Sequence, residues 1–172
     1  EVTISQAEGK TTRIYGNVYG GGALGDVGTY YTISEAGENK GNNIYLGGDE
    51  SGVCTVTVTG GTIGSEGNTT VGHVFGAGKG DATTYTCQRA MVKGTTVTVS
   101  NGTIYGNVYG GGEVGRVEHD AVVTIGTGTG SGPFAPIVHG SVFGAGAGLE
   151  TYGYSALVRG NSTVTVQGNA KV

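Results

Sequence analysis

Three histidines are the residues of this sequence best suited to metal or acid–base chemistry. They are His73, His119 and His139. A metal site needs its ligands at matched positions, but His73 follows the glycine of its repeat and His139 precedes the glycine of its own. His119 lies in Glu118-His119-Asp120, and alternate residues of a strand face opposite sides. We therefore expect a solvated loop at 118–120 and no metal site.

The carboxylates are the groups that a polysaccharide-cleaving enzyme would use. A glycosidase needs two of them at a defined separation in a cleft. The candidates are Asp49, Glu50, Asp81, Glu113, Glu118 and Asp120. They lie in glycine-rich corners, where charged groups keep a surface soluble. The chain has no tryptophan to serve as a sugar platform and no Gly-x-Ser-x-Gly motif. We predict that the protein is not an enzyme and uses no cofactor.

The two cysteines, Cys54 and Cys87, leave three alternatives open. Two thiols alone do not make a structural zinc site, and the chain has no Cys-x-x-Cys pair. In a secreted protein a disulfide between them is one alternative. Two free thiols, or bridges between subunits, also fit the sequence.

Three Asn-x-Ser/Thr sequons begin at Asn68, Asn101 and Asn161. Each is predicted to lie at a turn beside a strand, where an attached glycan would point outward. N-glycosylation at these positions would suit a protein of a surface layer.

Internal repeats organise the chain. One motif, a short apolar strand followed by glycines, occurs four times, with leading glycines Gly16, Gly72, Gly106 and Gly140. The copies at 14–22 and 104–112 are identical. A Thr/Val strand alternates with this motif, and equivalent positions recur after 67 residues, as from Thr55 to Val122. We predict a single domain, 1–172, with repeat copies at about 1–54, 55–121 and 122–172.

These repeats predict an all-β fold in which the strands of successive copies stack. Thr-Val-Thr-Val segments alternate with period two, so valines face one side and threonines the other. Recurring glycines mark corners, or places where another backbone comes close. We predict a β-solenoid, similar to a parallel β-helix, with glycine at its corners. An antiparallel β-sandwich or jelly roll is the alternative.

Aromatic residues recur at matched positions of the glycine motif. They are Tyr19, Phe75, Tyr109 and Phe143. The exchange of tyrosine for phenylalanine indicates that the ring matters more than the hydroxyl. We expect the rings to stack in the interior. A surface ladder that binds glycans or a partner is the alternative.

Composition excludes several classes of protein. Glycine accounts for 38 of 172 residues, and interior glycine costs a helix about 1 kcal/mol against alanine. A chain with net charge −4 and no basic stripe does not suit nucleic acid. No stretch of 18 apolar residues is present to form a membrane span. Low charge with a β-rich composition is typical of secreted proteins, so we predict an extracellular or cell-surface location.

The strands at the two ends lack the charges and prolines that normally blunt a sheet edge. Their apolar positions are Val2 and Ile4 at one end, and Val164 and Val166 at the other. Such edges favour strand addition between molecules. We expect copies of the chain to join head to tail into a homopolymer. The alternative is that the chain is a fragment of a longer array.

The run Ile-Tyr-Gly-Asn-Val-Tyr-Gly-Gly-Gly at 104–112 occurs with Thr-Val-Thr-Val and Gly-Gly-Thr-Ile segments. This combination resembles the glycine-rich repeats of very large secreted surface proteins of anaerobic bacteria and archaea. The resemblance extends from Thr11 onward, and it implies an adhesin-like, sheath or matrix role without catalytic residues. We predict an extracellular structural protein that self-assembles through β-edges into a filament, tube or sheath. An adhesin or glycan-binding module of a larger surface protein is the alternative.

Overall fold

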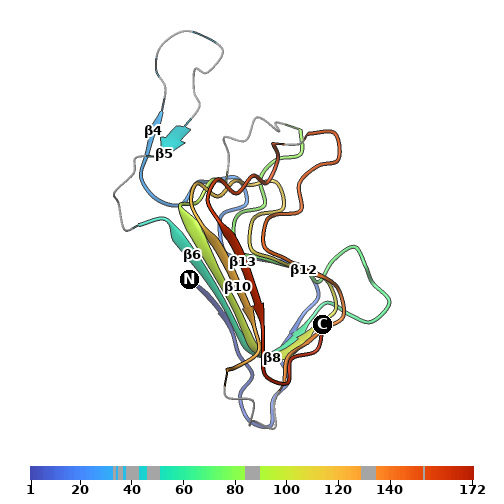
Figure 1. Ribbon diagram of the computed structural model, residues 1–172. Coiled ribbons are helices and arrows are strands. Elements are labelled where there is room, and N and C mark those ends of the chain that lie inside the picture. Colours follow the sequence, from blue (N-terminus) through green and yellow to red (C-terminus); the bar gives the residue numbers. More distant parts are fainter. Residues whose placement is uncertain are drawn as a thin grey trace.

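Figure 1 shows the computed structural model of the chain, which describes residues 1–32, 34, 37, 43–45, 51–83, 90–128, 135–152 and 154–172. Every regular element within these residues is a β-strand. The strands are β1 (Val2–Ile4), β2 (Arg13–Ile14), β3 (Val18–Tyr19), β4 (Tyr30–Thr32), β5 (Asn43–Tyr45), β6 (Val53–Ile63), β7 (Val74–Phe75), β8 (Gly94–Ile104), β9 (Val108–Tyr109), β10 (Ala121–Ile125), β11 (Ile137–Val138), β12 (Val142–Phe143) and β13 (Ser162–Val166). Valine, isoleucine, threonine and tyrosine dominate these strands because branched and aromatic side chains pack well on a pleated surface.

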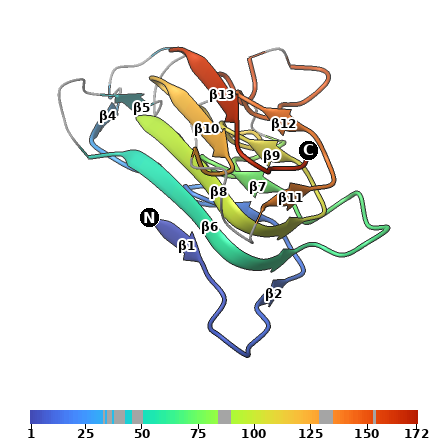
Figure 2. The same ribbon diagram turned by 60° about the horizontal axis from the view of Figure 1, so that its bottom comes forward.

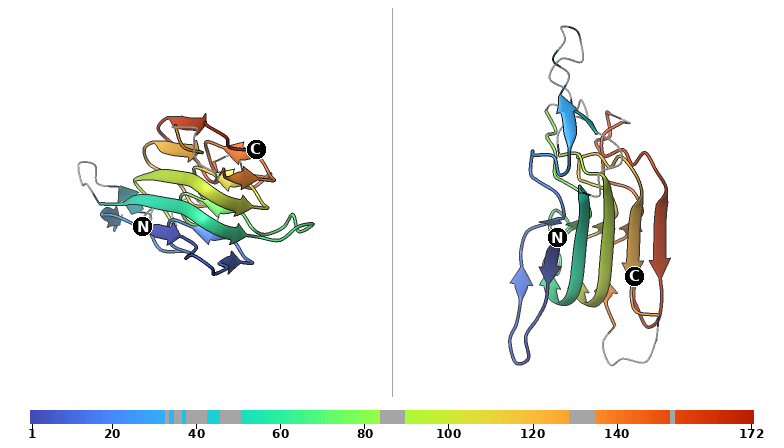
Figure 3. Two further views of the ribbon diagram at one scale, coloured as in Figure 1. Left: turned by 90° about the horizontal axis from the view of Figure 1, so that it is seen from below. Right: turned by 90° about the vertical axis from the view of Figure 1, so that its left-hand side faces the viewer.

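Seven strands form a parallel sheet, which we call sheet A. Its path runs β1–β6–β8–β10–β13, with β2 beside β6 and β11 beside β8 (Figure 3). The register places five valines in one row across the path: Val2, Val56, Val97, Val123 and Val164. A second row, two residues further along each strand, contains Ile4, Val58, Val99, Ile125 and Val166. Because side chains alternate along a strand, both rows face the same side of the sheet.

Four short strands form a second parallel sheet, sheet B, in the order β12–β9–β7–β3. A third row consists of single parallel bridges that join Val27, Val92, Val117 and Val158. The chain contributes a strand to sheet A, then a strand to sheet B, then a residue to this row, and repeats this order. We call each such set of segments a level, and the levels lie on one another as a stack. The levels are β1 to β3, then β6 with β7, then β8 with β9, then β10 to β12, and last β13.

The hydrophobic core lies between sheets A and B (Figure 2). Val56, Val97 and Val123 of sheet A and Val74 and Val108 of sheet B have no exposed surface. A smaller cluster fills the space beside the third row and contains Cys54, Ala77, Val92 and Val117. Burying a valine side chain contributes about 1.5–3 kcal/mol. Each level therefore stabilises the levels on either side of it.

A column of glycines lets the levels of sheet B approach one another. A Cβ on Gly20, Gly76 or Gly110 would overlap the carbonyl oxygen of the glycine one level further on. The N–H groups of these glycines donate to carbonyl oxygens of the next level, with N–O distances of 2.9 Å from Gly20 to Phe75 and from Gly110 to Phe143. Glycine is needed here because two backbones lie in contact.

Two predicted turns lie inside continuous strands. The sequence predicts turns at 60–62 and 101–103, but β6 and β8 run through them as strands of 11 residues each. The pairing between these strands shifts register around Thr59 and Thr62. Gly61 and Gly102 have φ angles of +90° and +102°. Each site is therefore a bulge that bends one strand, because a positive φ re-aims the backbone without ending the pairing.

The prediction of an all-β protein is confirmed, and both large sheets are parallel. The β-solenoid is not confirmed, because the sheets do not close: the third row holds only isolated bridges. Glycine-rich segments such as 110–115 reach that row, and glycine forms strands poorly. The antiparallel sandwich is wrong for these sheets. Within the described residues, antiparallel pairing is confined to β4 with β5 and to the Leu149–Tyr152 bridge.

Candidate functional site

The outer edges of sheet A, β1 and β13, lie at opposite ends of the stack (Figure 3). Val164 and Val166 on β13 are 41% and 51% exposed, whereas Val123 and Ile125 in the same rows are fully buried. At the other end, Val2 and Ile4 are half-buried and pack against the core from one side only. No described strand pairs with the outer side of either edge. All four residues predicted as assembly edges therefore lie on free edges.

The four matched aromatic rings form one continuous stack along sheet B. Their centroids are 5.0 Å apart from Tyr19 to Phe75, 4.8 Å from Phe75 to Tyr109 and 5.0 Å from Tyr109 to Phe143. The rings are within 10° of parallel. Phe75 in the middle is 2% exposed, but Phe143 at one end is 43% exposed. Tyr19 and Tyr109 are half-buried, and the neighbouring Val18, Val74 and Val108 face the core. Because side chains alternate along a strand, the rings lie on the other face of sheet B and not in the core between the sheets.

A ladder of polar side chains runs beside this stack, and sequence reasoning missed it. Asn17 Oδ1 accepts the backbone N–H of His73 at 3.0 Å, and His73 Nδ1 accepts the N–H of Asn107 at 2.8 Å. Asn107 Oδ1 in turn accepts the N–H of Ser141 at 2.9 Å. Each side chain therefore ties its own level to the next. The signal was available in the sequence, since these residues all follow the leading glycine of the repeated motif.

The tyrosine hydroxyls of the stack join the same polar network. Asn17 Nδ2 donates to the hydroxyl of Tyr19 at 3.1 Å, and Asn107 Nδ2 donates to that of Tyr109 at 2.8 Å. The Tyr19 hydroxyl also donates to Glu113 Oε2, two levels away. Burial and this bond to Glu113 raise the pKa of Tyr19 to about 12. The tyrosine is therefore a fixed hydrogen-bond donor at neutral pH.

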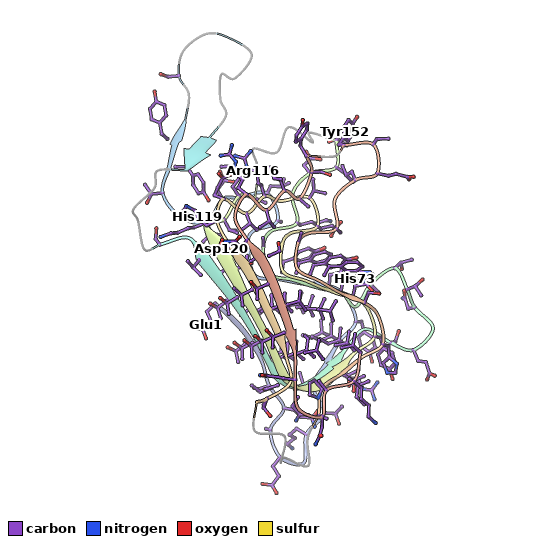
Figure 4. All side chains as sticks on the ribbon, viewed as in Figure 1. Glu1, His73, Arg116, His119, Asp120 and Tyr152 are labelled. Carbon is purple, nitrogen blue, oxygen red and sulfur yellow. The ribbon has the colours of Figure 1, made fainter. Side chains whose placement is uncertain are left out.

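His73 and His139 occupy different positions in the stack, as the sequence predicts. His73 belongs to the polar ladder, and burial lowers its pKa although the charge of Glu113 acts in the opposite direction. His139 lies flat on Tyr105, with ring centroids 4.6 Å apart. Figure 4 shows His73 on the side of sheet B, away from His119 at the start of the sheet A strands. Within the described residues no three potential ligands gather into a metal site.

The candidate carboxylates that lie in the described residues link levels or stabilise a turn. Glu118 departs from the expected solvated corner: its side chain is 6% exposed and bridges Arg116 and Arg159, with 3.1 Å to the latter. Asp120 accepts the N–H of Asn161 at 2.7 Å, which joins adjacent levels. Asp81 accepts the N–H of Thr83 at 2.8 Å in a local turn. Asp49 and Glu50 lie outside the described residues.

Among the described residues, two grooves have linings that lie away from the aromatic stack. The larger, about 720 Å³, follows the strand bulges and is lined by Gln6, Ala7, Glu8, Gly9, Thr59, Gly60, Gly61, Thr62, Asn101, Gly102 and Thr103. Among these residues Glu8 is the one carboxylate. The smaller, about 220 Å³, contains His119 and Asp120. Neither of these two linings contains a pair of carboxylates, since Glu8 lies in one and Asp120 in the other.

Cys54 has a free thiol that is 3% exposed, and burial raises its pKa. It packs beside Ala77 and Val92 as a small apolar side chain. Cys87 lies outside the described residues, so the three alternatives for the two cysteines stay open.

The sequons differ in accessibility. Asn68 is exposed, and its Oδ1 accepts the N–H of Thr70 at 3.0 Å within a turn. Asn161 is exposed directly before β13, with Nδ2 at 3.4 Å from Asp120 Oδ1. Asn101 was expected at a turn but lies half-buried inside β8, because the strand continues through its bulge. Two of the three sequons thus present their asparagine to solvent.

A scan of protein-family models and searches of curated proteins and of solved structures return no match to this chain. Within the described residues there is no helix of the length and apolarity needed to cross a membrane.

Proposed function

We propose that this protein is an extracellular structural protein, built as a β-solenoid, whose copies self-assemble end to end into a filament, tube or sheath. The observation that carries the proposal is the free edge at β13. It presents Val164 and Val166, 41% and 51% exposed, in the same rows as valines and isoleucines that are fully buried inside the stack. An edge with this register is a template for another parallel strand.

The two edges of sheet A are complementary in sequence and direction. β1 and β13 both pair in parallel with their neighbouring strands. Val2 lies in the same row as Val164, and Ile4 lies in the same row as Val166. A second copy that approaches β13 with its first level would continue both rows. Such a contact joins two different surfaces, so its repetition gives an open polymer when no ring closes.

The chemistry of the stack suits a mechanical role. Each level is held by backbone hydrogen bonds to its neighbours, by the polar ladder from Asn17 to Ser141 and by stacked rings. The charged residues Glu118 and Asp120 are engaged in links between levels. A polymer that repeats these contacts would resist denaturants and proteases.

The experiment is to follow the size of the purified 172-residue protein by sedimentation velocity over a hundredfold range of concentration, with negative-stain imaging of the largest species. We expect fibres or tubes with the width of one or a few chains. A stable monomer at the highest concentration would contradict the proposal.

A second candidate, an adhesin or glycan-binding module, is favoured by one observation. Phe143 exposes 43% of its surface at the end of the stack, and an exposed aromatic face can serve as a platform for a sugar or a partner. Glycan-array binding by a monomeric protein, lost in Phe143→Ala, would favour this candidate over self-assembly.

A further inference from the structure

Sheets A and B end at different levels. In sheet A the last strand is β13, which pairs with β10. In sheet B the last strand is β12, which belongs to the same level as β10 and β11. No described strand of sheet B lies on the level of β13, so β12 keeps a free edge. Figure 2 shows β12 and β13 near this end of the stack. Phe143 on β12 is exposed.

This offset conflicts with simple docking of one edge on the other. If β1 of a second copy paired with β13, the Tyr19 of that copy would lie two levels above Phe143. Neighbouring strands are about 4.8 Å apart, so the two rings would be separated by about 10 Å. Rings within the chain are 4.8–5.0 Å apart. Edge docking would therefore leave a gap of one strand in sheet B.

We propose that β13 of one copy replaces β1 beside β6 of the next copy. This inference rests on the proposed self-assembly and specifies how the two ends join. Replacement lowers the second copy by one level, so its β3 lies directly above β12 and the stack runs from Phe143 to the partner's Tyr19. Lys171 bridges Ile137 and so lies in the row that Arg13 shares with Thr62. The segment from β13 to Lys171 therefore takes the place of both β1 and β2, which are released from the edge. Both sheets then continue without a gap.

The register permits this exchange. Val164 lies in the row that Val2 shares with Val56, and Val166 lies in the row that Ile4 shares with Val58. β13 can thus adopt the place of β1 with its apolar side chains in the same positions.

The exchange also increases the length of the pairing. β1 has 3 residues against β6, whereas β13 has 5. The positions of β6 that β1 leaves unpaired, Cys54 and Thr55, lie in the rows of Ser162 and Thr163. The exchange adds backbone pairing at these two positions, and the valines of β13 gain a covered side.

Two further ladders continue across such a junction. Asn17, His73 and Asn107 each accept the N–H of the next level, and Ser141 holds the equivalent place at the top, where its hydroxyl can accept the N–H of the partner's Asn17. In the glycine column, Gly20, Gly76 and Gly110 each lie against the carbonyl oxygen of the next glycine. Gly144 at the top of that column has no such neighbour among the described residues.

The test is a reversible lock on β1. Thr3 and Thr57 are register partners, so the double variant Thr3→Cys/Thr57→Cys, with Cys54→Ala and Cys87→Ser, can form a disulfide that holds β1 on β6. The matched control is Thr98→Cys/Thr124→Cys in the same background, which joins β8 to β10 inside the stack. We expect the oxidised lock to reduce polymer at least tenfold and reductant to restore it, while the control polymerises in both states.

A crosslink identifies the junction independently of the lock. Proteins with Thr165→Cys and with Thr57→Cys are mixed, assembled and oxidised, and a parallel mixture pairs Thr165→Cys with Thr3→Cys. Replacement predicts disulfides between positions 165 and 57. Crosslinks between 165 and 3, or full polymerisation of the locked protein, would overturn the replacement and leave the proposed function intact. If the unlocked background protein forms no polymer, both proposals are wrong.

Discussion

The backbone N–H of Asn107 donates to Nδ1 of His73 across a distance of 2.8 Å. The acceptor nitrogen must be unprotonated, and burial already lowers the pKa of His73, although Glu113 and the Thr69 carbonyl act in the opposite direction. His73 can therefore accept this hydrogen bond, as an asparagine side chain does at other levels, only in its neutral form. Asn17 and Asn107, at the equivalent positions of other levels, carry no such dependence on pH.

Acidification should destabilise the protein through His73. The pKa of His73 is lower in the folded protein than in the unfolded chain, where it is about 6.5. The contribution of His73 to the free energy of unfolding is therefore complete above about pH 6.5. This contribution decreases as the pH falls from about 6.5 toward the folded pKa. Loss of the hydrogen bond costs about 1 kcal/mol. We expect His73→Asn to weaken the loss of stability between pH 7 and pH 5, measured by urea denaturation. His139→Tyr, which can still stack on Tyr105, serves as the control and should keep the wild-type slope. Equal slopes for His73→Asn and wild type would contradict the assignment.

The glycine column should be intolerant of a methyl group. In Gly110→Ala the new Cβ would overlap the carbonyl oxygen of Gly144, and the two levels would have to separate. We expect a loss of about 1–3 kcal/mol in the free energy of unfolding, measured by chemical denaturation. Gly16→Ala is the matched control, since no atom lies within 4 Å of its added Cβ, and it should change stability by no more than about 0.5 kcal/mol. Similar losses for the two variants would show that backbone contact is not the reason for the column.

Substitutions at different places in the aromatic stack should affect either the stability of the fold or the assembly of copies. Phe75 is 2% exposed, so Phe75→Ala should cost about 3–5 kcal/mol of unfolding free energy. Phe143 is 43% exposed at the end of the stack, so Phe143→Ala should cost far less but raise the concentration needed for polymer severalfold. Phe143→Tyr should assemble like the wild type, because tyrosine occupies two other places in the stack. Unchanged polymerisation of Phe143→Ala by light scattering would place this ring outside the interface.

A charge on the apolar face of β13 should block assembly. Val164→Lys adds an ammonium to a row whose other members are apolar, and lysine is a residue that natural edges use against strand addition. We expect the protein to stay folded, because the whole of β13 is exposed, and to sediment as a monomer. Thr165→Lys is the control, since its side chain points to the opposite face of the same strand. Polymer formation by Val164→Lys would exclude this row from the contact.

Several features could be predicted because they are local properties of the chain. Alternation in Thr163-Val164-Thr165-Val166 indicates a strand with one apolar face whatever it pairs with. The matched spacing of Tyr19, Phe75, Tyr109 and Phe143 implies that equivalent rings meet when repeats stack. The polar ladder was missed because its members differ in type: asparagine, histidine and serine share only the ability to accept a hydrogen bond. The bulges at Gly61 and Gly102 lie where the sequence predicts turns, because the same residue types favour both.

The all-β class, the apolar rows and the repeated glycines follow from local sequence, because side-chain alternation and backbone freedom act within a few residues. Long-range pairing sets the other features: the sheets are parallel and do not close, and Glu118 is buried between two arginines. It also leaves Val123 covered while Val164 in the same row is exposed. These outcomes depend on which strand lies beside which. Nearly identical strands become core or edge by their place in the stack, and that place is set by pairing between residues far apart in the chain.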